Sequence, residues 1–252
     1  MSESGEDTIL LEGHISIAAV LEAGTRPVYE LFALKETSNR AVRRVIQQAE
    51  ARSIPVRHES AEEIAARAGG SSHGGLLAVA GPRTFVDATE LAKVDNPFIV
   101  MLDGVEDPFN FGQSVRALYA AGASGLVVRP RNWFTAAAIV ARASAGASER
   151  IATTIIDSAL EAAEVYREGG IVVACTAQQA AFLLHECDLT VPIFLLIGGE
   201  RRGVTRSFRE QADLLINIPY GRSFRQSLGS AASAAVIGFE VLRQRNAGIL
   251  RT

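Results

Sequence analysis

The sequence contains few of the residues that build metal centres and disulfide frameworks. Among its 252 residues there are two cysteines, Cys175 and Cys187, and neither CxxC spacing nor a nearby pair of histidines accompanies them. We therefore expect no zinc site and no other metal site, because such sites need several ligands at short spacings. Both cysteines are interpreted as small buried hydrophobic side chains or as residues without a role.

Long hydrophobic runs are also lacking. No apolar stretch approaches the roughly 20 residues that a membrane-spanning helix requires. The start, MSESGEDT, is acidic and polar, whereas a secretory signal peptide begins with basic residues and continues with apolar ones. These absences predict a cytoplasmic protein without a membrane partner.

The common nucleotide fingerprints are absent as well. Residues 198–205, GGERRGVT, nearly spell the phosphate-binding pattern G-x-x-x-x-G-K-[ST], but Val204 stands where the lysine should reach the phosphates. This substitution argues against ATP or GTP hydrolysis. No G-x-G-x-x-G follows the first strand of either half, so a dinucleotide cofactor is not indicated.

Alternating strand and helix patterns fill the chain. They predict an α/β domain over residues 1–84, in which Ser38 would cap a helix, and a second α/β domain over residues 97–252. Residues 85–96 contain Asp, Asn and Pro and are the expected linker. The second domain has strongly apolar strands with helices between them. A mostly parallel sheet covered by helices on both faces is therefore predicted.

Three loops that follow strands of the second domain contain polar residues of chemical interest. They include Asn110 and Arg116, then Glu200, then Ser227. Ligands of parallel sheets bind in such loops. Simpler interpretations stay open: a surface arginine, a turn-forming asparagine, a carboxylate near a helix start and a serine helix cap.

These loops resemble the three sequence motifs of the SpoU (TrmH-type) RNA ribose 2'-O-methyltransferases, of the knotted SPOUT class. The first motif, an Asn-x-Gly turn followed by an arginine and an alanine-glycine helix end, matches residues 110–122. The second, an apolar strand running into Gly-x-Glu-x-x-Gly, matches residues 198–203. The third, Ile-Pro followed by a loop and Ser-Leu, matches residues 218–228. Each motif is weak alone, but the three occur in order and with family-like spacing.

The resemblance implies a methyltransferase that uses S-adenosylmethionine. Backbone amides of glycine-rich loops can grip that cofactor, which accounts for the small residues in these loops. By resemblance, the cofactor-binding residues are Thr176, Ile197, Gly198, Gly199, Gly203, Ile218, Ser227 and Leu228.

The resemblance also makes Arg116 the catalytic residue that acts on the ribose 2'-hydroxyl. A guanidinium is a poor general base because its pKa exceeds about 12, so binding the adjacent phosphate and stabilising the alkoxide suit it better. Either role requires Arg116 to face a cleft. Asn110 would hold Arg116 or contact the ribose. Glu200 would orient Arg116 or a loop amide, and Ser227 would hydrogen-bond Arg116 or the substrate.

RNA, either tRNA or rRNA, is the implied partner. Residues 12–24 and 71–83 resemble a substrate-binding domain often fused to this family and similar to a small ribosomal protein. The family likeness further implies a trefoil knot over residues 190–235 and a homodimer. Small residues of the last helix would pack in that dimer: Ala231, Ala234, Ala235, Ile237 and Gly238. A basic rim for RNA is expected from Arg201, Arg202, Arg206, Arg222 and Arg225, unless these form a solvated face.

One position departs from the family pattern. Gly229 stands where the third motif commonly has an asparagine, which puts the rate and the substrate in doubt. An alternative is therefore a non-catalytic RNA-binding or ribosome-assembly protein that retains the methyltransferase fold. A small-molecule-binding α/β protein unconnected with RNA is a third interpretation.

Overall fold

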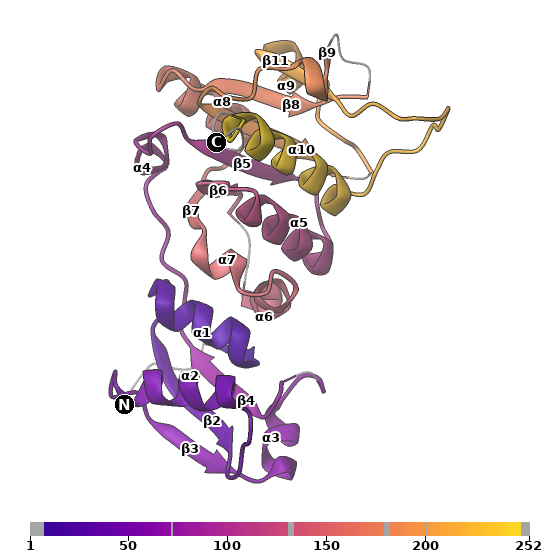
Figure 1. The fold of residues 1–252 in the computed structure, drawn as a ribbon. Helices are drawn as coiled ribbons and strands as arrows, with labels where there is room; N and C mark the ends of the chain where they lie inside the picture. The colour runs from indigo at the N-terminus through magenta and orange to yellow at the C-terminus, as the bar shows by residue number, and fades with distance from the viewer. Residues whose placement is uncertain (1–7, 72, 131–133, 179–181, 200, 248–252) are drawn as a thin grey trace. The chain divides into compact units, whose positions relative to one another are not determined.

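The computed structural model describes residues 8–71, 73–130, 134–178, 182–199 and 201–247 and divides the chain into two compact units (Figure 1). The first unit comprises residues up to 84 together with residues 132–150. The second comprises residues 85–131 and 151–252. Helices α6 (Phe134–Ala143) and α7 (Ala147–Arg150) fall inside the expected domain over residues 97–252 in sequence, but they pack with the first unit.

The first unit is built on a mixed four-stranded sheet with the order β1-β4-β2-β3. Strand β4 pairs antiparallel with both β1 and β2, and β3 joins β2 in parallel as an edge strand. The strands are β1 (Ile9–Glu12), β2 (Val28–Leu34), β3 (Val56–Glu59) and β4 (Leu76–Ala80).

Helices cover both faces of this sheet. Successive residues of β2 point to opposite faces, so Leu31 and Ala33 enter the main core while Phe32 enters a smaller core with Ile64. Asn39, and not the expected Ser38, caps the second helix by accepting from the Ala41 amide. Helices α1 (His14–Ala23) and α2 (Arg40–Glu50) lie over the main core, and α3 (Ala61–Arg67) lies over the smaller one.

A buried ion pair attaches α7 to the first unit. The Glu149 carboxylate lies 3.0 Å from Arg26 Nε and also accepts from the Thr25 hydroxyl. Arg83 lies 3.5 Å from the same carboxylate. Removing one partner of a buried pair leaves a desolvated charge, which makes this contact expensive to break.

We expect Glu149→Gln to lower the stability of the first unit by about 3 kcal/mol, because Arg26 then keeps its buried charge without a carboxylate. Amide hydrogen exchange of α1 and α7 in urea measures this change. Glu62→Gln, on the exposed surface of α3, is the matched control and should leave exchange nearly unchanged.

The second unit contains a seven-stranded sheet with the order β7-β6-β5-β10-β8-β11-β9, parallel at every pairing. Its central strands are apolar almost throughout, as a sheet covered on both faces requires. The strands are β5 (Phe98–Asp103), β6 (Gly125–Val128), β7 (Ala152–Ile155), β8 (Val172–Thr176), β9 (Phe182–Leu183), β10 (Ile193–Gly198) and β11 (Leu214–Asn217).

Two sets of helices cover this sheet. Helices α4 (Ala88–Ala92), α8 (Ala159–Glu168) and α9 (Arg206–Gln211) share one core, in which the rings of Tyr166 and Phe194 are 4.9 Å apart. Helix α4 lies inside the expected linker 85–96, and its Leu91 is buried in that core. This segment is therefore part of the second unit. A 3-10 turn, η1 (Leu184–Glu186), precedes β10.

Helices α5 (Pro108–Ala120) and α10 (Ser230–Arg245) pack against each other in the second unit (Figure 1). A Cβ at Gly238 would lie 3.0 Å from the Ala121 methyl group and 3.4 Å from Leu118. Ala234, Ile237 and Gly238 are buried. The small-residue face of α10, expected in a dimer, therefore packs within the chain.

Two glycine backbones touch where β5 and β10 end. The Gly199 amide donates to the Asp103 carbonyl at 2.6 Å, and a Cβ at Gly199 would lie 2.0 Å from the Gly104 carbonyl oxygen. The loop then folds back, since the Gly203 amide donates to the Gly199 carbonyl and Gly203 has φ of 59°. Backbone crowding explains the glycine at position 199.

We expect Gly199→Ala to force the two loops apart and to cost about 2 kcal/mol, because no Cβ fits against the Gly104 carbonyl. Thermal unfolding and limited proteolysis of residues 199–205 measure the effect. Gly221→Ala provides the control, since its Cβ would have nothing within 4 Å. Equal melting temperatures for the two variants would contradict this account of the contact.

Candidate functional site

The carboxyl ends of β8, β10 and β11 border a cavity of about 780 Å³. Because these strands are parallel neighbours, the loops that follow them leave the same edge of the sheet. Every predicted cofactor-binding residue lines this cavity: Thr176, Ile197, Gly198, Gly199, Gly203, Ile218, Ser227 and Leu228.

A second cavity of about 210 Å³ lies at the end of β5 and is lined by the loop 104–107 and by Asn110. Arg201 lines both cavities, and Gly104 packs on Gly199, so the first predicted loop lies beside the second. Asn110 lies inside the first turn of α5, where its backbone N–H donates to the carboxylate of Asp107, the N-cap residue. The interpretation as a turn residue ahead of the helix is therefore wrong.

The structure places Arg116 apart from both cavities. Its side chain is exposed on α5 and lines neither of them. The expectation that Arg116 faces a cleft is therefore not met by either of these two cavities and stays a prediction. The physical reason is its helical position, because α5 buries Val115 and Leu118 on the side that faces the core.

The two remaining predicted catalytic residues have different outcomes. Glu200 lies outside the described residues. Ser227 lines the large cavity and does not cap a helix, because α10 begins at Ser230 with Gly229 as its N-cap. Gly229 offers no side-chain hydrogen bond to that helix end, so the missing asparagine of the third motif falls at a helix cap.

The large cavity has a strongly positive lining. Five arginines line it and none of its described lining residues is acidic, although the whole chain has a net charge of −3. Arg206 differs from the expected rim because it pairs with Glu210 on α9 and lines neither cavity. The electrostatic field of the cavity therefore favours anions. Its arginines are Arg201, Arg202, Arg209, Arg222 and Arg225.

Sequence reasoning missed several polar residues of this cavity. Gln178 follows the end of β8 and Asn217 is the last residue of β11, a signal that the search for strand ends could have used. Arg209 and Ser233 come from α9 and from the first turn of α10. Their placement depends on how those helices pack, which no local motif encodes.

The described part of the chain offers neither a reactive thiol nor a metal site. Burial raises the pKa of the Cys175 thiol to about 12, so its thiolate is not available near neutral pH. Both cysteines are buried, as predicted. Over the ranges that the structure describes, no group of histidine, cysteine, aspartate and glutamate side chains could hold a metal ion, and no helix is long and apolar enough to cross a bilayer.

Family profiles match both parts of the chain. Residues 97–239 match the SpoU rRNA Methylase family, and residues 10–86 match a domain described as RNA 2'-O ribose methyltransferase substrate binding. The first match covers more than half of the chain and includes all the loops that line the two cavities.

Comparison with individual proteins also finds SpoU-type methyltransferases. The chain is 31% identical to the 23S rRNA (guanosine-2'-O-)-methyltransferase RlmB of Pectobacterium atrosepticum, over 94% of this chain and 98% of the relative. It is 29% identical to RlmB of Shewanella oneidensis, over 94% and 97%. Its fold is similar to that of the SpoU methyltransferase AviRb from Streptomyces viridochromogenes in complex with AdoMet, with a TM-score of 0.79 at 23% identity over 95% and 91% of the two chains. On these grounds the chain belongs to the SpoU rRNA Methylase family.

Proposed function

We propose that this protein transfers a methyl group from S-adenosylmethionine to a ribose 2'-hydroxyl of ribosomal RNA. The observation that carries the proposal is the convergence of the family's second and third motif loops on one cavity at the carboxyl edge of the sheet. The RlmB relatives are named for 23S rRNA, which favours rRNA over tRNA and implies action in the cytoplasm.

The large cavity fits the cofactor. Its volume of about 780 Å³ lies within the range of small-molecule sites. Ile197, Ile216 and Ile218 would offer an apolar surface for the adenine ring, and Gly198, Gly199 and Gly203 line the same cavity without side chains that would fill it. When bound, the cofactor supplies a methyl group activated by a sulfonium.

The protein's part in the reaction is to position and polarise the 2'-hydroxyl. Methyl transfer is an in-line displacement, so the hydroxyl must be held about 3 Å from the methyl carbon. Asn110 would hold the ribose or Arg116, while Ser227 and Glu200 would position the arginine or the substrate. The Arg116 guanidinium would bind the adjacent phosphate and stabilise the developing alkoxide.

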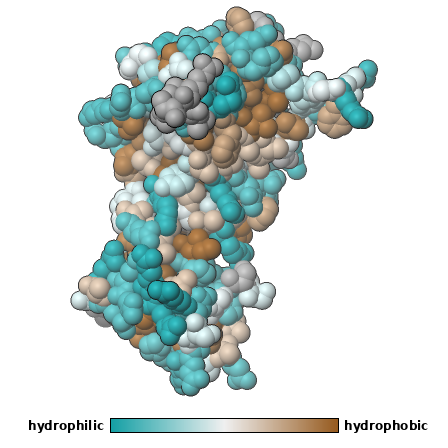
Figure 2. All heavy atoms as spheres, viewed as in Figure 1, coloured by the Kyte–Doolittle hydropathy of each residue, from teal (hydrophilic) through white to brown (hydrophobic). Residues whose placement is uncertain are grey.

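We propose that a second copy of the chain completes the site, because Arg116 lines neither cavity of its own chain. The exposed face of α5 and α10 includes Tyr119, Val236 and Phe239, which are 39%, 43% and 49% exposed. In Figure 2 hydrophobic residues gather over α10. A homodimer that covers this face would carry Arg116 into the interface and toward the cavity of its partner.

A trefoil knot over residues 190–235 is part of the same proposal. Strand β11 lies beyond β8 in the sheet, whereas α10, which follows it, packs on α5. The chain must therefore return across β8 and β10 between these two elements. Threading through the loop before β10 would place residues 218–229 against the cofactor cavity, which most of them line.

The first unit would bind the RNA. This role follows from the match of residues 10–86 to a substrate-binding domain. We propose residues 1–84, with α6 and α7 packed on them, as the substrate-binding unit and the remainder as the methyltransferase unit.

Titration with S-adenosylmethionine and tritium transfer to rRNA test the proposed function. We expect cofactor binding and transfer to a ribose 2'-oxygen, mapped by resistance to alkaline cleavage. Binding of RNA without transfer would instead support the non-catalytic alternative. A Gly229→Asn variant that gains transfer activity would then identify the missing asparagine as the cause.

We expect Arg116→Ala to reduce transfer by at least about a hundredfold, because the developing alkoxide loses its cationic partner. Cofactor affinity, measured by calorimetry, should change little, since Arg116 does not line the cavity. Arg206→Ala is the control for removing an exposed helical arginine and should retain turnover. Near-normal transfer by Arg116→Ala would disprove the assigned role.

Mixed dimers test whether Arg116 acts on the partner's cavity. Arg116→Ala should be co-expressed with Ile218→Trp, which fills the cavity but keeps its arginine. Random pairing makes half of the dimers mixed, each with one complete site, so activity should recover to about a quarter of the normal value. No recovery, with mixed dimers verified by affinity tags, would show that Arg116 acts within its own chain.

A further inference from the structure

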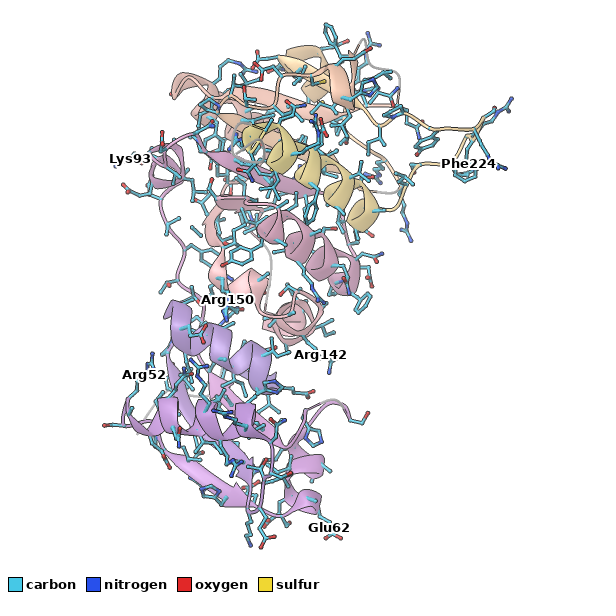
Figure 3. The ribbon with its side chains drawn as sticks, in the orientation of Figure 1. Arg52, Glu62, Lys93, Arg142, Arg150 and Phe224 are labelled. Atoms are coloured by element: carbon cyan, nitrogen blue, oxygen red, sulfur yellow. The ribbon has the colours of Figure 1, made fainter. Side chains whose placement is uncertain are left out.

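The segment 219–228 projects from the second unit without helix or strand structure (Figure 1). We call it the projecting loop. Phe224 lies near its tip with 60% of its surface exposed, the largest fraction among the exposed large hydrophobic residues described (Figure 3). An apolar ring held this far into solvent loses hydrophobic stabilisation unless a ligand covers it.

Hydrogen bonds of Tyr220 hold the projecting loop together. Its hydroxyl accepts from the Leu228 amide at 3.0 Å and donates to the Gln226 carbonyl at 3.3 Å. Its ring centroid lies 6.1 Å from that of Phe224. The phenol therefore joins the two arms of the loop and supports the exposed ring near its tip.

Two arginines flank the exposed ring. Arg222 and Arg225 are exposed, line the large cavity and form no ion pair with any carboxylate in the part of the chain that the structure describes. The cofactor does not explain the presence of these arginines, because the positive charges of its sulfonium and ammonium groups exceed the negative charge of its single carboxylate. The ligand of these arginines should therefore be an anion.

We propose that the projecting loop binds single-stranded RNA next to the methylated nucleotide. Phe224 stacks on an unpaired base, and Arg222 and Arg225 contact the phosphates on either side of it. Tyr220 is a positioning residue that keeps the loop in shape. The proposal rests on the proposed function. It adds that the RNA bound at this site is single-stranded and has an unstacked base.

Charge favours RNA over a second copy of the chain as the occupant. The centres of protein interfaces are depleted in charged residues, whereas two arginines beside an aromatic ring are typical of single-strand binding. The exposed face of α5 and α10 carries Tyr119, Val236 and Phe239, and it is the surface proposed above for self-association.

The test uses the full-length protein and a short single-stranded oligoadenylate that contains one 2-aminopurine. We expect Phe224→Ala to weaken binding about tenfold and to abolish the quenching of 2-aminopurine fluorescence that stacking causes. With deproteinised 23S rRNA, KM should rise while kcat changes little. Phe85→Ala, which removes an exposed ring that lines neither cavity, is the control.

Salt dependence tests the two arginines. Replacing both Arg222 and Arg225 by alanine should lower the slope of log affinity against log salt by about 1.4, as expected for two contacts to single-strand phosphates. Arg206→Ala should leave the slope unchanged. Tyr220→Phe removes only the hydroxyl, so it should weaken quenching and raise KM several-fold without altering the net charge.

Three outcomes would overturn the proposal. One is unchanged RNA affinity and quenching in Phe224→Ala, and another is loss of cofactor affinity with normal RNA binding, which would make the loop a cofactor lid. The third is dissociation into monomers, which would make the loop a dimer contact. Failure of the proposed function is distinguishable, because the normal protein would then bind and quench the oligonucleotide without methylating rRNA.

Discussion

The contact between Gly199 and the end of β5 determines the geometry of the site. The Gly199 amide donates to the Asp103 carbonyl, and no side-chain atom fits between its Cα and Gly104. This contact ties the first motif loop to the second, while the parallel pairing of β8 with β10 and β11 brings in the third. The two cavities therefore share a wall, to which Arg201 contributes on both sides.

Most of the fold could be predicted from the sequence because the strands are apolar on both faces. Runs such as β5 and β10 are buried along nearly their whole length, which indicates a parallel sheet between two layers of helices. The placement of α6 and α7 in the first unit could not be predicted. It depends on long-range contacts. One example is the ion pair between Glu149 and Arg26, two residues that are 123 positions apart in the sequence.

The parts of the candidate site that depend on backbone position could be predicted from the sequence. The parts that depend on the direction of a side chain could not. Every predicted cofactor residue lies on one cavity, because motif spacing reports strand ends and turns. Arg116 shows the limit, since its motif position does not reveal which face of α5 it occupies or what covers that face. The glycine at position 199 has two explanations, a cofactor site and the packing of the backbone. Gly104 crowds this position whether or not a cofactor is bound.

The chain passes between the two units three times, near residues 84, 131 and 150. A single cut therefore cannot separate them into complete pieces. During synthesis the first unit must wait for residues 132–150, so its strands emerge from the ribosome well before the helices that cover part of its core. The apolar surface that receives Ala137 and Ala141 stays open over that interval, and it is covered before residues 151–252 of the second unit have been made.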